Sequence, residues 1–320
     1  MNAENDFRRL MGRLRLRHLA LLDLLGKDPN VGRAAKIMHM AQPTASKLLR
    51  EIEDIFETAL FIRNRRGLTP TPAGEVLTRR AGILLAEIHA TQTELRSALN
   101  GGTGHLRLGV FPVAVTEFLP QLYAAMQKNW PGLTIEIEEA VETRLLYQLS
   151  QGKIDCILGR IVMENLTPDL RHEALYDEPT VIVCSTRHPL LSANTPEQVQ
   201  ILRNTHWMLP ARQGAVYNMV ASKLATLGIK APQVEVETTS VFVTIELLNH
   251  TTLLSILPKK VALAYAELNK VALAPLGDLE SNYPVGIMYR AEALSNPIIN
   301  LVLETMRGIS EQIRAEHTRT

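Results

Sequence analysis

A short glycine-rich segment at residues 100–104 (NGGTG) separates two different patterns of apolar residues. Before this segment the apolar residues recur at helical spacing, and after it short apolar runs alternate with segments of helical pattern. The chain is therefore predicted to be α/β with a helix-rich N-terminus and a flexible joint between its two parts. We expect domains at residues 1–71 and 105–320, joined by a linker helix and hinge at residues 72–104.

Residues 105–320 are predicted to form two similar α/β units around a mostly parallel sheet. The strands expected in the first unit are HLRLGVF, LTIEIEEA and IDCILGRI, and those in the second are EPTVIVCS, HWMLP, QVEVETT and LLSILP. The segment at 271–276, the strand VGIMYR and a helix at about 296–313 close the chain. Because ligands bind at the carboxyl ends of such strands, we expect a small-molecule cleft between the two units.

A helix-turn-helix is predicted near the N-terminus. A helix at residues 16–25 stops at Gly26, and Asn30 is a good N-cap for a short helix at residues 31–38. A third helix begins near Pro43, and its apolar residues recur at i, i+3, i+4 and i+7 to form a buried stripe: Ala45, Leu48, Leu49 and Ile52. Its opposite face carries hydrogen-bonding and cationic side chains: Gln42, Thr44, Ser46, Lys47 and Arg50.

A basic β-wing is predicted beside these helices, in the segment FIRNRRGLTPT at residues 61–71. Its cations precede Gly67: Arg63, Arg65 and Arg66. A solvated charged loop is the alternative interpretation. Thr71 and Pro72 then provide an N-cap and first position for a long helix that runs to about residue 100. This helix has too many apolar residues for a lone exposed helix, so we expect it to pair with a second copy of itself.

Charge is distributed unevenly along the chain, although the net charge is only +1. Residues 1–104 contain 16 lysines and arginines against 11 aspartates and glutamates, whereas the remainder contains 18 against 22. A basic head on an acidic body indicates nucleic acid as a partner at one end. The chain has only 2 Trp, 7 Tyr and 6 Phe, which argues against a single-strand reader that stacks bases on exposed aromatic rings.

Several other classes of protein are disfavoured by what the sequence lacks. Cys156 and Cys184 lie far apart in apolar runs, so they are expected to be buried and inert rather than paired or metal-bound. No phosphate-binding glycine motif and no HExxH pair occurs, and we expect no catalytic residues, no metal and no cofactor. Neither a signal segment nor an apolar run of roughly 18 residues is present, which favours a cytoplasmic protein without a membrane partner.

The segment AAKIMHMAQPTASKLLREIEDIFETALFIRNRRGLTPTPAGE resembles the winged helix-turn-helix of the LysR-type transcriptional regulators. LTIEIEEA, TRLLYQLSQGKIDCILGRI and STRHPLL resemble the first part of that family's effector-binding domain, which has a periplasmic-binding-protein-like fold. The resemblance covers the whole chain. It implies a homo-oligomer, dimer or tetramer, that regulates transcription in response to a small-molecule effector. Double-stranded promoter DNA and RNA polymerase are the macromolecular partners that it implies.

By family position the expected DNA-binding residues are Gln42, Pro43, Thr44, Ser46, Lys47 and Arg50 on the recognition helix and Arg63, Arg65 and Arg66 in the wing. Arginine can bind guanine through two hydrogen bonds, glutamine suits adenine, and serine suits phosphates. A polar helix face that only meets solvent is the alternative. The family commonly has Ser or Thr where this chain has Ala41, so an N-cap hydroxyl worth about 1 kcal/mol is missing.

The resemblance also implies effector-binding residues: Val113, Thr116, Thr143, Arg160, Gln213, Gly214, Thr239 and Ser240. Val113 stands where many relatives carry a hydroxyl, and Thr143 has helix capping as an alternative role. Arg160 follows a strand, as in family members that regulate aromatic-acid degradation, with a surface arginine as the competing interpretation. Cations and helix N-termini at strand ends favour a negative group, so we expect the effector to be a small organic anion.

A second class of function is a cytoplasmic solute-binding protein or enzyme that uses the N-terminal helices only for dimerisation. Such a module has no need for Arg50 and the three wing arginines on one side, and the body shows no nucleophile and base at recognisable spacing. A nucleoid-type architectural protein is a third possibility, but it would not need a ligand-binding body. The basic head therefore favours a sequence-specific regulator.

Overall fold

The computed structural model describes residues 10–64, 67–99, 104–116, 118–210, 215–279 and 283–317. Backbone contacts divide the chain into two units. One comprises Met1–His105 with Leu146–Asp155, and the other comprises Leu106–Leu145 with Cys156–Thr320.

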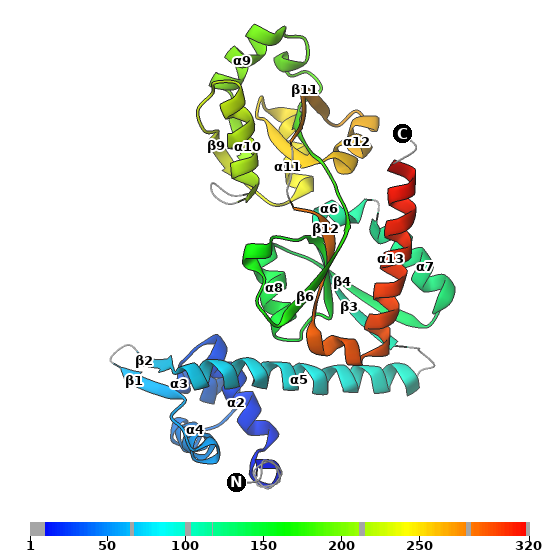
Figure 1. Cartoon of the computed structure of the whole chain (residues 1–320). Coiled ribbons are helices and arrows are strands. Elements are labelled where there is room, and N and C mark those ends of the chain that lie inside the picture. The colour runs from blue at the N-terminus through cyan, green and yellow to red at the C-terminus, as the bar shows by residue number, and fades with distance from the viewer. Residues whose placement is uncertain are drawn as a thin grey trace. The chain divides into compact units, whose positions relative to one another are not determined.

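The N-terminal part contains α2 (Leu16–Lys27), α3 (Val31–Ile37), α4 (Gln42–Phe56), β1 (Phe61–Asn64), β2 (Gly67–Pro70) and α5 (Pro72–Leu99) (Figure 1). Helices α2, α3 and α4 enclose a core to which the start of α5 also contributes. The predicted stripe of α4 is buried, with Ala45, Leu48, Leu49 and Ile52 at most 4% exposed. These elements confirm the predicted helix-turn-helix.

Local capping residues set the helix boundaries in this part. Asn30 Oδ1 accepts a 3.0 Å hydrogen bond from the Arg33 N–H, as expected for an N-cap. Thr71 Oγ1 accepts a 3.1 Å hydrogen bond from the Gly74 N–H and so caps α5. Helix α4 has a proline in its first turn, and Ala41 at its N-cap offers no side-chain hydrogen bond.

The body begins with the strands and helices β3 (Gly104–Val110), α6 (Pro112–Val115), α7 (Phe118–Asn129), β4 (Leu133–Glu139), α8 (Glu142–Ser150), β5 (Cys156–Arg160) and β6 (Leu170–Tyr176). It continues with β7 (Thr180–Cys184), α9 (Thr195–Asn204), β8 (His206–Leu209), α10 (Ala215–Thr226), β9 (Gln233–Glu237), α11 (Val241–His250), β10 (Ser255–Pro258), α12 (Lys259–Glu267) and β11 (Ala272–Leu279). It ends with β12 (Val285–Arg290) and α13 (Pro297–His317). Three short 3-10 helices lie among these elements, at Met163–Asn165, Pro189–Leu191 and Ala291–Ser295.

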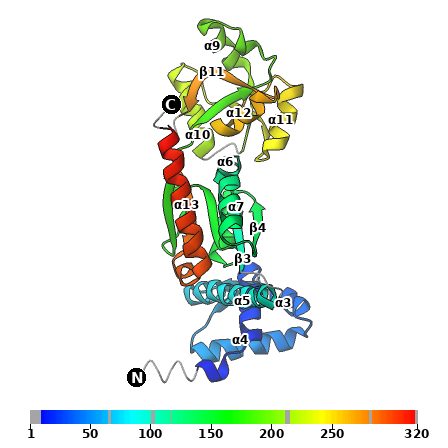
Figure 2. The ribbon, with the colours of Figure 1, turned by 90° about the vertical axis from the view of Figure 1, so that its right-hand side faces the viewer.

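Two groups of strands make up the body, and we call them the first and second subdomains. The first holds a five-stranded sheet in the order β4-β3-β5-β12-β6, and α7 and α13 contact each other beside it (Figure 1, Figure 2). The second contains the sheet β10-β7-β11 and the pair β8-β9. Hydrogen bonds between Met208 N and Leu254 O (2.8 Å) and between Leu254 N and His206 O (3.1 Å) connect β8 to the residues before β10. The expected α/β body with two subdomains is therefore present.

The sheets are less parallel than the sequence suggested. Strands β3 and β5 are parallel, but β12 runs antiparallel to both β5 and β6. In the second subdomain β10 and β11 both run antiparallel to β7. Strand β12 is antiparallel to β6 because the chain leaves the first sheet at Tyr176, the end of β6, and returns beside it at Val285, the start of β12.

Two elements are present that the sequence pattern did not predict, β6 and α12. The sequence of β6, LRHEALY, has three polar residues in its middle, and its burial does not alternate. Neither an apolar run nor a period of two is therefore visible there.

Both cysteines are buried, as predicted, and burial raises the pKa of the Cys184 thiol to about 12. A thiol with a raised pKa is a poor nucleophile near neutral pH. None of the helices described here is both long and apolar enough to cross a membrane. Across the same residues no group of three or more His, Cys, Asp or Glu side chains could hold a metal ion.

Candidate nucleic-acid interface and effector residues

The outward face of α4 carries the predicted DNA-binding residues. Gln42, Pro43, Thr44, Lys47 and Arg50 are exposed, and Ser46 is half-buried. The Arg50 side chain lies back along its own helix, where Nε is 3.4 Å from the carbonyl oxygen of Ser46. The same helix thus packs one stripe into the core and presents hydrogen-bonding groups on the other side.

A cavity of about 510 Å³ lies between α4 and the β1-β2 ribbon. Its lining residues are Ser46, Leu49, Arg50, Glu53, Phe61, Arg63 and Leu68. The structure therefore brings Arg50 of the helix and Arg63 of the ribbon to one concave surface. Arg65 and Arg66 lie outside the described residues.

The ribbon confirms the predicted wing. Strands β1 and β2 are antiparallel, with Arg63 opposite Leu68 and Asn64 opposite Gly67. Asn64 Nδ2 donates a 2.6 Å hydrogen bond to Thr69 Oγ1 across the ribbon. Gly67 has φ of +128°, a conformation that residues with a side chain rarely adopt.

Glu53 is a functional candidate that the sequence pattern missed. It lies on α4 but faces the wing, and its Oε1 accepts hydrogen bonds from the N–H groups of Leu60 (2.9 Å) and Phe61 (3.3 Å). A periodicity argument assigns a half-buried glutamate to the polar face and cannot show these two N–H donors. The one signal in the sequence was the small number of residues between the end of α4 and the wing.

Helix α5 exposes apolar side chains along part of its length. Leu77 and Leu85 pack on the N-terminal core, whereas other apolar residues of α5 are at least 38% exposed: Val76, Leu84, Ile88, Leu95 and Leu99. Leu84, Ile88 and Leu95 follow one another at intervals of four and seven residues, as the d, a and a positions of a coiled-coil heptad do, and Leu99 lies one residue beyond the next d position. This face is suited to contact a second helix.

The first-subdomain effector candidates lie at or near strand ends. Val113 is buried in α6, which follows β3, and Thr116 just after it is exposed. Thr143 is exposed and is the second residue of α8, so it lies inside the first turn rather than at the N-cap. Parallel pairing of β3 with β5 places the segment after Val110 next to Arg160 at the end of β5.

Arg160 is held by oxygen atoms of the protein itself. Its Nη1 donates to the carbonyl oxygen of Tyr283 (3.0 Å), and its Nη2 donates to the carbonyl oxygen of Glu178 and to Thr180 Oγ1 (both 2.8 Å). Burial lowers the pKa of Arg160, although Glu178, Tyr176 and Asp177 oppose that effect. The side chain is therefore not a freely solvated surface arginine, and it connects β5 to both segments that link the subdomains.

Two candidates of the second subdomain lie just before α11. Thr239 and Ser240 are exposed, and Ser240 Oγ caps α11 by accepting a 3.3 Å hydrogen bond from the Val243 N–H. Gln213 and Gly214 lie outside the described residues. Of the predicted effector residues that are described, Val113 and Thr116 thus lie just after β3, Thr143 lies after β4 and Arg160 ends β5, while Ser240 caps a helix.

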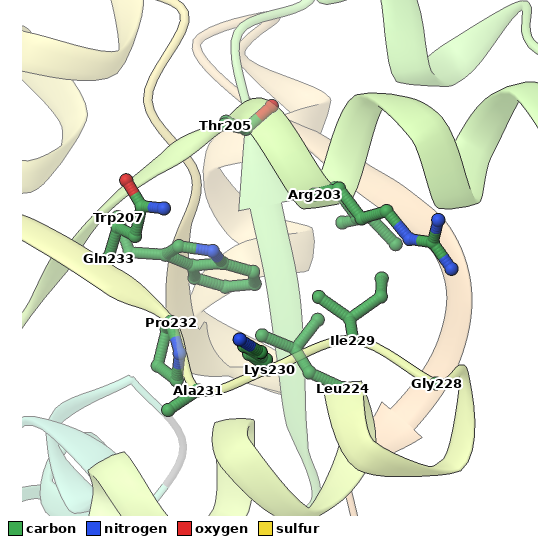
Figure 3. Close-up of a pocket in the computed structure, with 11 residues that line it drawn as sticks. Arg203, Thr205, Trp207, Leu224, Gly228, Ile229, Lys230, Ala231, Pro232 and Gln233 are labelled. Carbon is green, nitrogen blue, oxygen red and sulfur yellow. The ribbon is translucent and has the colours of Figure 1, made fainter.

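A separate cavity of about 300 Å³ lies in the second subdomain. Figure 3 shows apolar side chains around it, including Trp207, Leu224 and Ile229, while the guanidinium of Arg203 points away. None of the predicted effector residues lines this cavity. Its position therefore adds no support to them.

Two family models match the chain. Residues 16–75 match the model described as "Bacterial regulatory helix-turn-helix protein, lysR family", and residues 99–309 match "LysR substrate binding domain". The first match spans α2 to the start of α5, and the second spans most of the body.

Similar proteins match over nearly the whole chain. The HTH-type transcriptional regulator PcaQ of Agrobacterium fabrum is 27% identical over 311 residues, which cover 94% of this chain and 96% of PcaQ. The HTH-type transcriptional regulator GbpR of Azospirillum brasilense is 24% identical over 302 residues, which cover 94% of this chain and 88% of GbpR. The structure of full-length CbnR complexed with its target DNA has a similar fold, with 20% identity and a TM-score of 0.60, over 92% of this chain and 100% of CbnR.

Proposed function

The chain belongs to the LysR family of bacterial transcriptional regulators, and from this premise we propose which of its residues read DNA and which respond to an effector. Its class is that of DNA-binding regulators with an effector-binding domain, and its relatives are regulators rather than enzymes. We propose that α4 enters the major groove and that the β1-β2 wing contacts the adjacent DNA backbone.

The observation that carries this proposal is the cavity shared by Arg50 and Arg63. Arg50 lies on the exposed face of the recognition helix, where a guanidinium can form two hydrogen bonds with guanine. Arg63 comes from the wing and lies on the same concave surface, where a cation suits a phosphate. Gln42, Pro43, Thr44, Ser46 and Lys47 complete the proposed helix surface, and Arg65 and Arg66 complete the proposed wing.

The test is a comparison of two duplexes. One carries the site that footprinting finds in DNA upstream of the chain's own gene or its neighbours, and the other carries the same bases scrambled. We expect the wild type to prefer the first by at least about 10³-fold, and Arg50→Ala to lose that preference. Equal affinity of the wild type for both duplexes, or an unchanged preference in Arg50→Ala, would contradict the proposed roles.

We propose that the protein binds DNA as an oligomer that is joined along α5. Two recognition helices can then read half-sites about one helical turn apart. The exposed apolar side chains of α5 at coiled-coil spacing support this assignment. Action on transcription implies RNA polymerase as a further partner and the bacterial cytoplasm as the location, and both belong to the proposal.

We propose that the effector is a small organic anion bound between the two subdomains. The end of β5 supplies the cation Arg160, and Val113 supplies an apolar contact in place of the hydroxyl that relatives carry. Thr116, Thr143, Gln213, Gly214, Thr239 and Ser240 are the further proposed contacts. Because Arg160 already donates to three protein oxygens, an anion would share the guanidinium with these acceptors.

A screen of carboxylates by thermal shift, followed by calorimetry, tests the effector proposal. We expect acidic hits that bind wild type more tightly than Arg160→Ala. Neutral hits, or an acidic hit that both proteins bind equally well, would contradict the anion and leave the regulator class intact.

A further inference from the structure

Glu53 accepts hydrogen bonds from several backbone N–H groups in the connection between α4 and the wing. Its carbonyl oxygen accepts hydrogen bonds from the N–H of Glu57, which is the C-cap of α4, and from the N–H of Thr58 at 3.2 Å. Its side-chain Oε1 accepts from the N–H groups of Leu60 at 2.9 Å and Phe61 at 3.3 Å. One residue thus receives four of the N–H groups between the last turn of the helix and the first residue of β1.

The two side-chain contacts are made where backbone groups need partners. Leu60 is fully buried and Phe61 is 7% exposed, so their N–H groups lie where an unpaired donor is costly. Hydrogen bonds to a carboxylate are about twice as strong as those between neutral groups. The Glu53 carboxylate therefore fixes the start of β1 against the recognition helix.

The position of Arg63 depends on this attachment. Arg63 lies two residues after Phe61 in β1, and Arg50 lies three residues before Glu53 on α4. All three charged side chains line the cavity between helix and wing. The Glu53 side chain is hydrogen-bonded to the backbone at the start of the wing. It therefore sets where the Arg63 cation lies relative to Arg50 when the protein meets DNA.

We propose that Glu53 is a positioning residue for DNA reading, which couples the wing to the recognition helix and so determines how well the protein discriminates between sequences. This inference rests on the proposed function of α4 and the wing. Direct contact with the DNA backbone is disfavoured for a carboxylate, since phosphates repel it. The residue acts through Leu60 and Phe61 instead.

Removal of Glu53 has two effects of opposite direction on binding. Loss of the two hydrogen bonds frees the wing and lowers affinity for the correct site. Loss of one negative charge on a DNA-facing surface raises affinity for every sequence. The ratio of specific to scrambled affinity separates these effects, because the charge acts on both duplexes alike.

The experiment compares Glu53→Ala and Glu53→Gln with wild type and with Asp54→Ala. Asp54 is an exposed carboxylate on the same helix, so its removal matches the change in charge. A glutamine amide oxygen can still accept from both N–H groups. We expect the affinity ratio to fall about tenfold in Glu53→Ala, equivalent to about 1.4 kcal/mol, and to stay within about threefold of wild type in Glu53→Gln and Asp54→Ala.

Hydrogen exchange of the peptide at residues 57–64 provides a second measurement, and we expect faster exchange in Glu53→Ala only. If Glu53→Ala does not fold, Glu53→Asp replaces it, because the shorter side chain keeps the charge but falls short of the two N–H groups. An unchanged ratio in the folded variant overturns the inference, as does an equal fall in Asp54→Ala or in Glu53→Gln. If wild type itself does not discriminate, the DNA-reading function has failed instead, and the role of Glu53 falls with it.

Discussion

Arg160 donates a 2.8 Å hydrogen bond from Nη2 to Thr180 Oγ1, which ties the last residue of β5 to the first residue of β7. The two strands belong to different sheets. The same guanidinium also donates to the carbonyl oxygens of Glu178 and Tyr283, which lie in the two segments that connect the subdomains. One side chain thus joins both connections to the first sheet.

Replacement of Arg160 by alanine should destabilise the protein. Three oxygen atoms would lose a charged donor at a half-buried position, and such losses cost about 1.5–3 kcal/mol for one interaction and less than the sum for several. We expect the free energy of unfolding in urea to fall by about 2–4 kcal/mol. Arg187→Ala, at an exposed arginine of the second subdomain, serves as the control and should change it by less than about 0.5 kcal/mol. Equal stabilities of the two variants would show that the three hydrogen bonds contribute little.

Arg63→Ala should weaken binding to every DNA sequence, and most at the correct site, where a phosphate contact also fixes the register of the recognition helix. A cation that contacts a phosphate releases a counterion on binding, so its loss lowers the slope of log affinity against log salt concentration by about 0.9. Anisotropy titrations at several salt concentrations measure this slope. We expect the same change for Arg65→Ala. A loss of sequence preference with an unchanged slope would instead indicate that Arg63 contacts a base.

Charged substitutions at Leu84 and Ile88 together should separate the oligomer. These side chains are 48% and 38% exposed in the single chain, and an oligomer along α5 would cover them. We expect Leu84→Glu/Ile88→Glu to sediment as a monomer and to bind DNA more weakly, because the two heads are no longer linked. Circular dichroism checks that the variant remains folded. A variant that sediments like wild type would place the interface elsewhere.

Buried histidines should make the protein less stable in mild acid. His188 Nδ1 accepts from the Leu190 N–H at 3.1 Å, and Nε2 lies 3.1 Å from the Thr252 carbonyl oxygen, so the neutral ring with its proton on Nε2 satisfies both contacts. Burial lowers the pKa of His188 below its ordinary value of 6.5, although the Thr252 carbonyl opposes this. Burial also lowers the pKa of His18.

The sign of the effect follows from these lowered pKa values. Above pH 6.5 these rings are neutral in both states, whereas at lower pH the unfolded chain takes up protons that the folded chain resists. Stability is therefore fully present above pH 6.5 and is lost as the pH falls towards the folded-state pKa values. Urea unfolding from pH 8 to pH 5 should show a smaller loss for His188→Gln than for wild type or for the exposed control His250→Gln. Parallel loss in all three proteins would exclude His188 as a cause.

Local signals explain why the N-terminal part could be predicted well. Asn30, Thr71 and the apolar stripe of α4 act within a few residues of their own position, so their pattern is visible in the sequence. The role of Glu53 could not be predicted, because its hydrogen-bond donors, the N–H groups of Leu60 and Phe61, reach it only after the connection has turned back towards α4.

Long-range partners limited the prediction of the body. Arg160 was correctly expected at the end of a strand, but its partners lie 18, 20 and 123 residues further along the chain. Strand β6 was missed since Arg171, His172 and Glu173 interrupt any apolar pattern. Its place in the sheet depends on pairing with β12, more than 100 residues later.

The pairing of β6 with β12 places Tyr176 opposite Val285, where the chain departs for the second subdomain and where it comes back. The second subdomain is therefore an insertion whose two ends meet at one pair of the β6-β12 ladder, next to a register shift between Val285 and Gly286. A module attached in this way can be exchanged between proteins without cutting the host sheet, since a tight turn could join the two strands directly. The sheet that anchors it and the module that it carries are thus separable units on which selection can act independently.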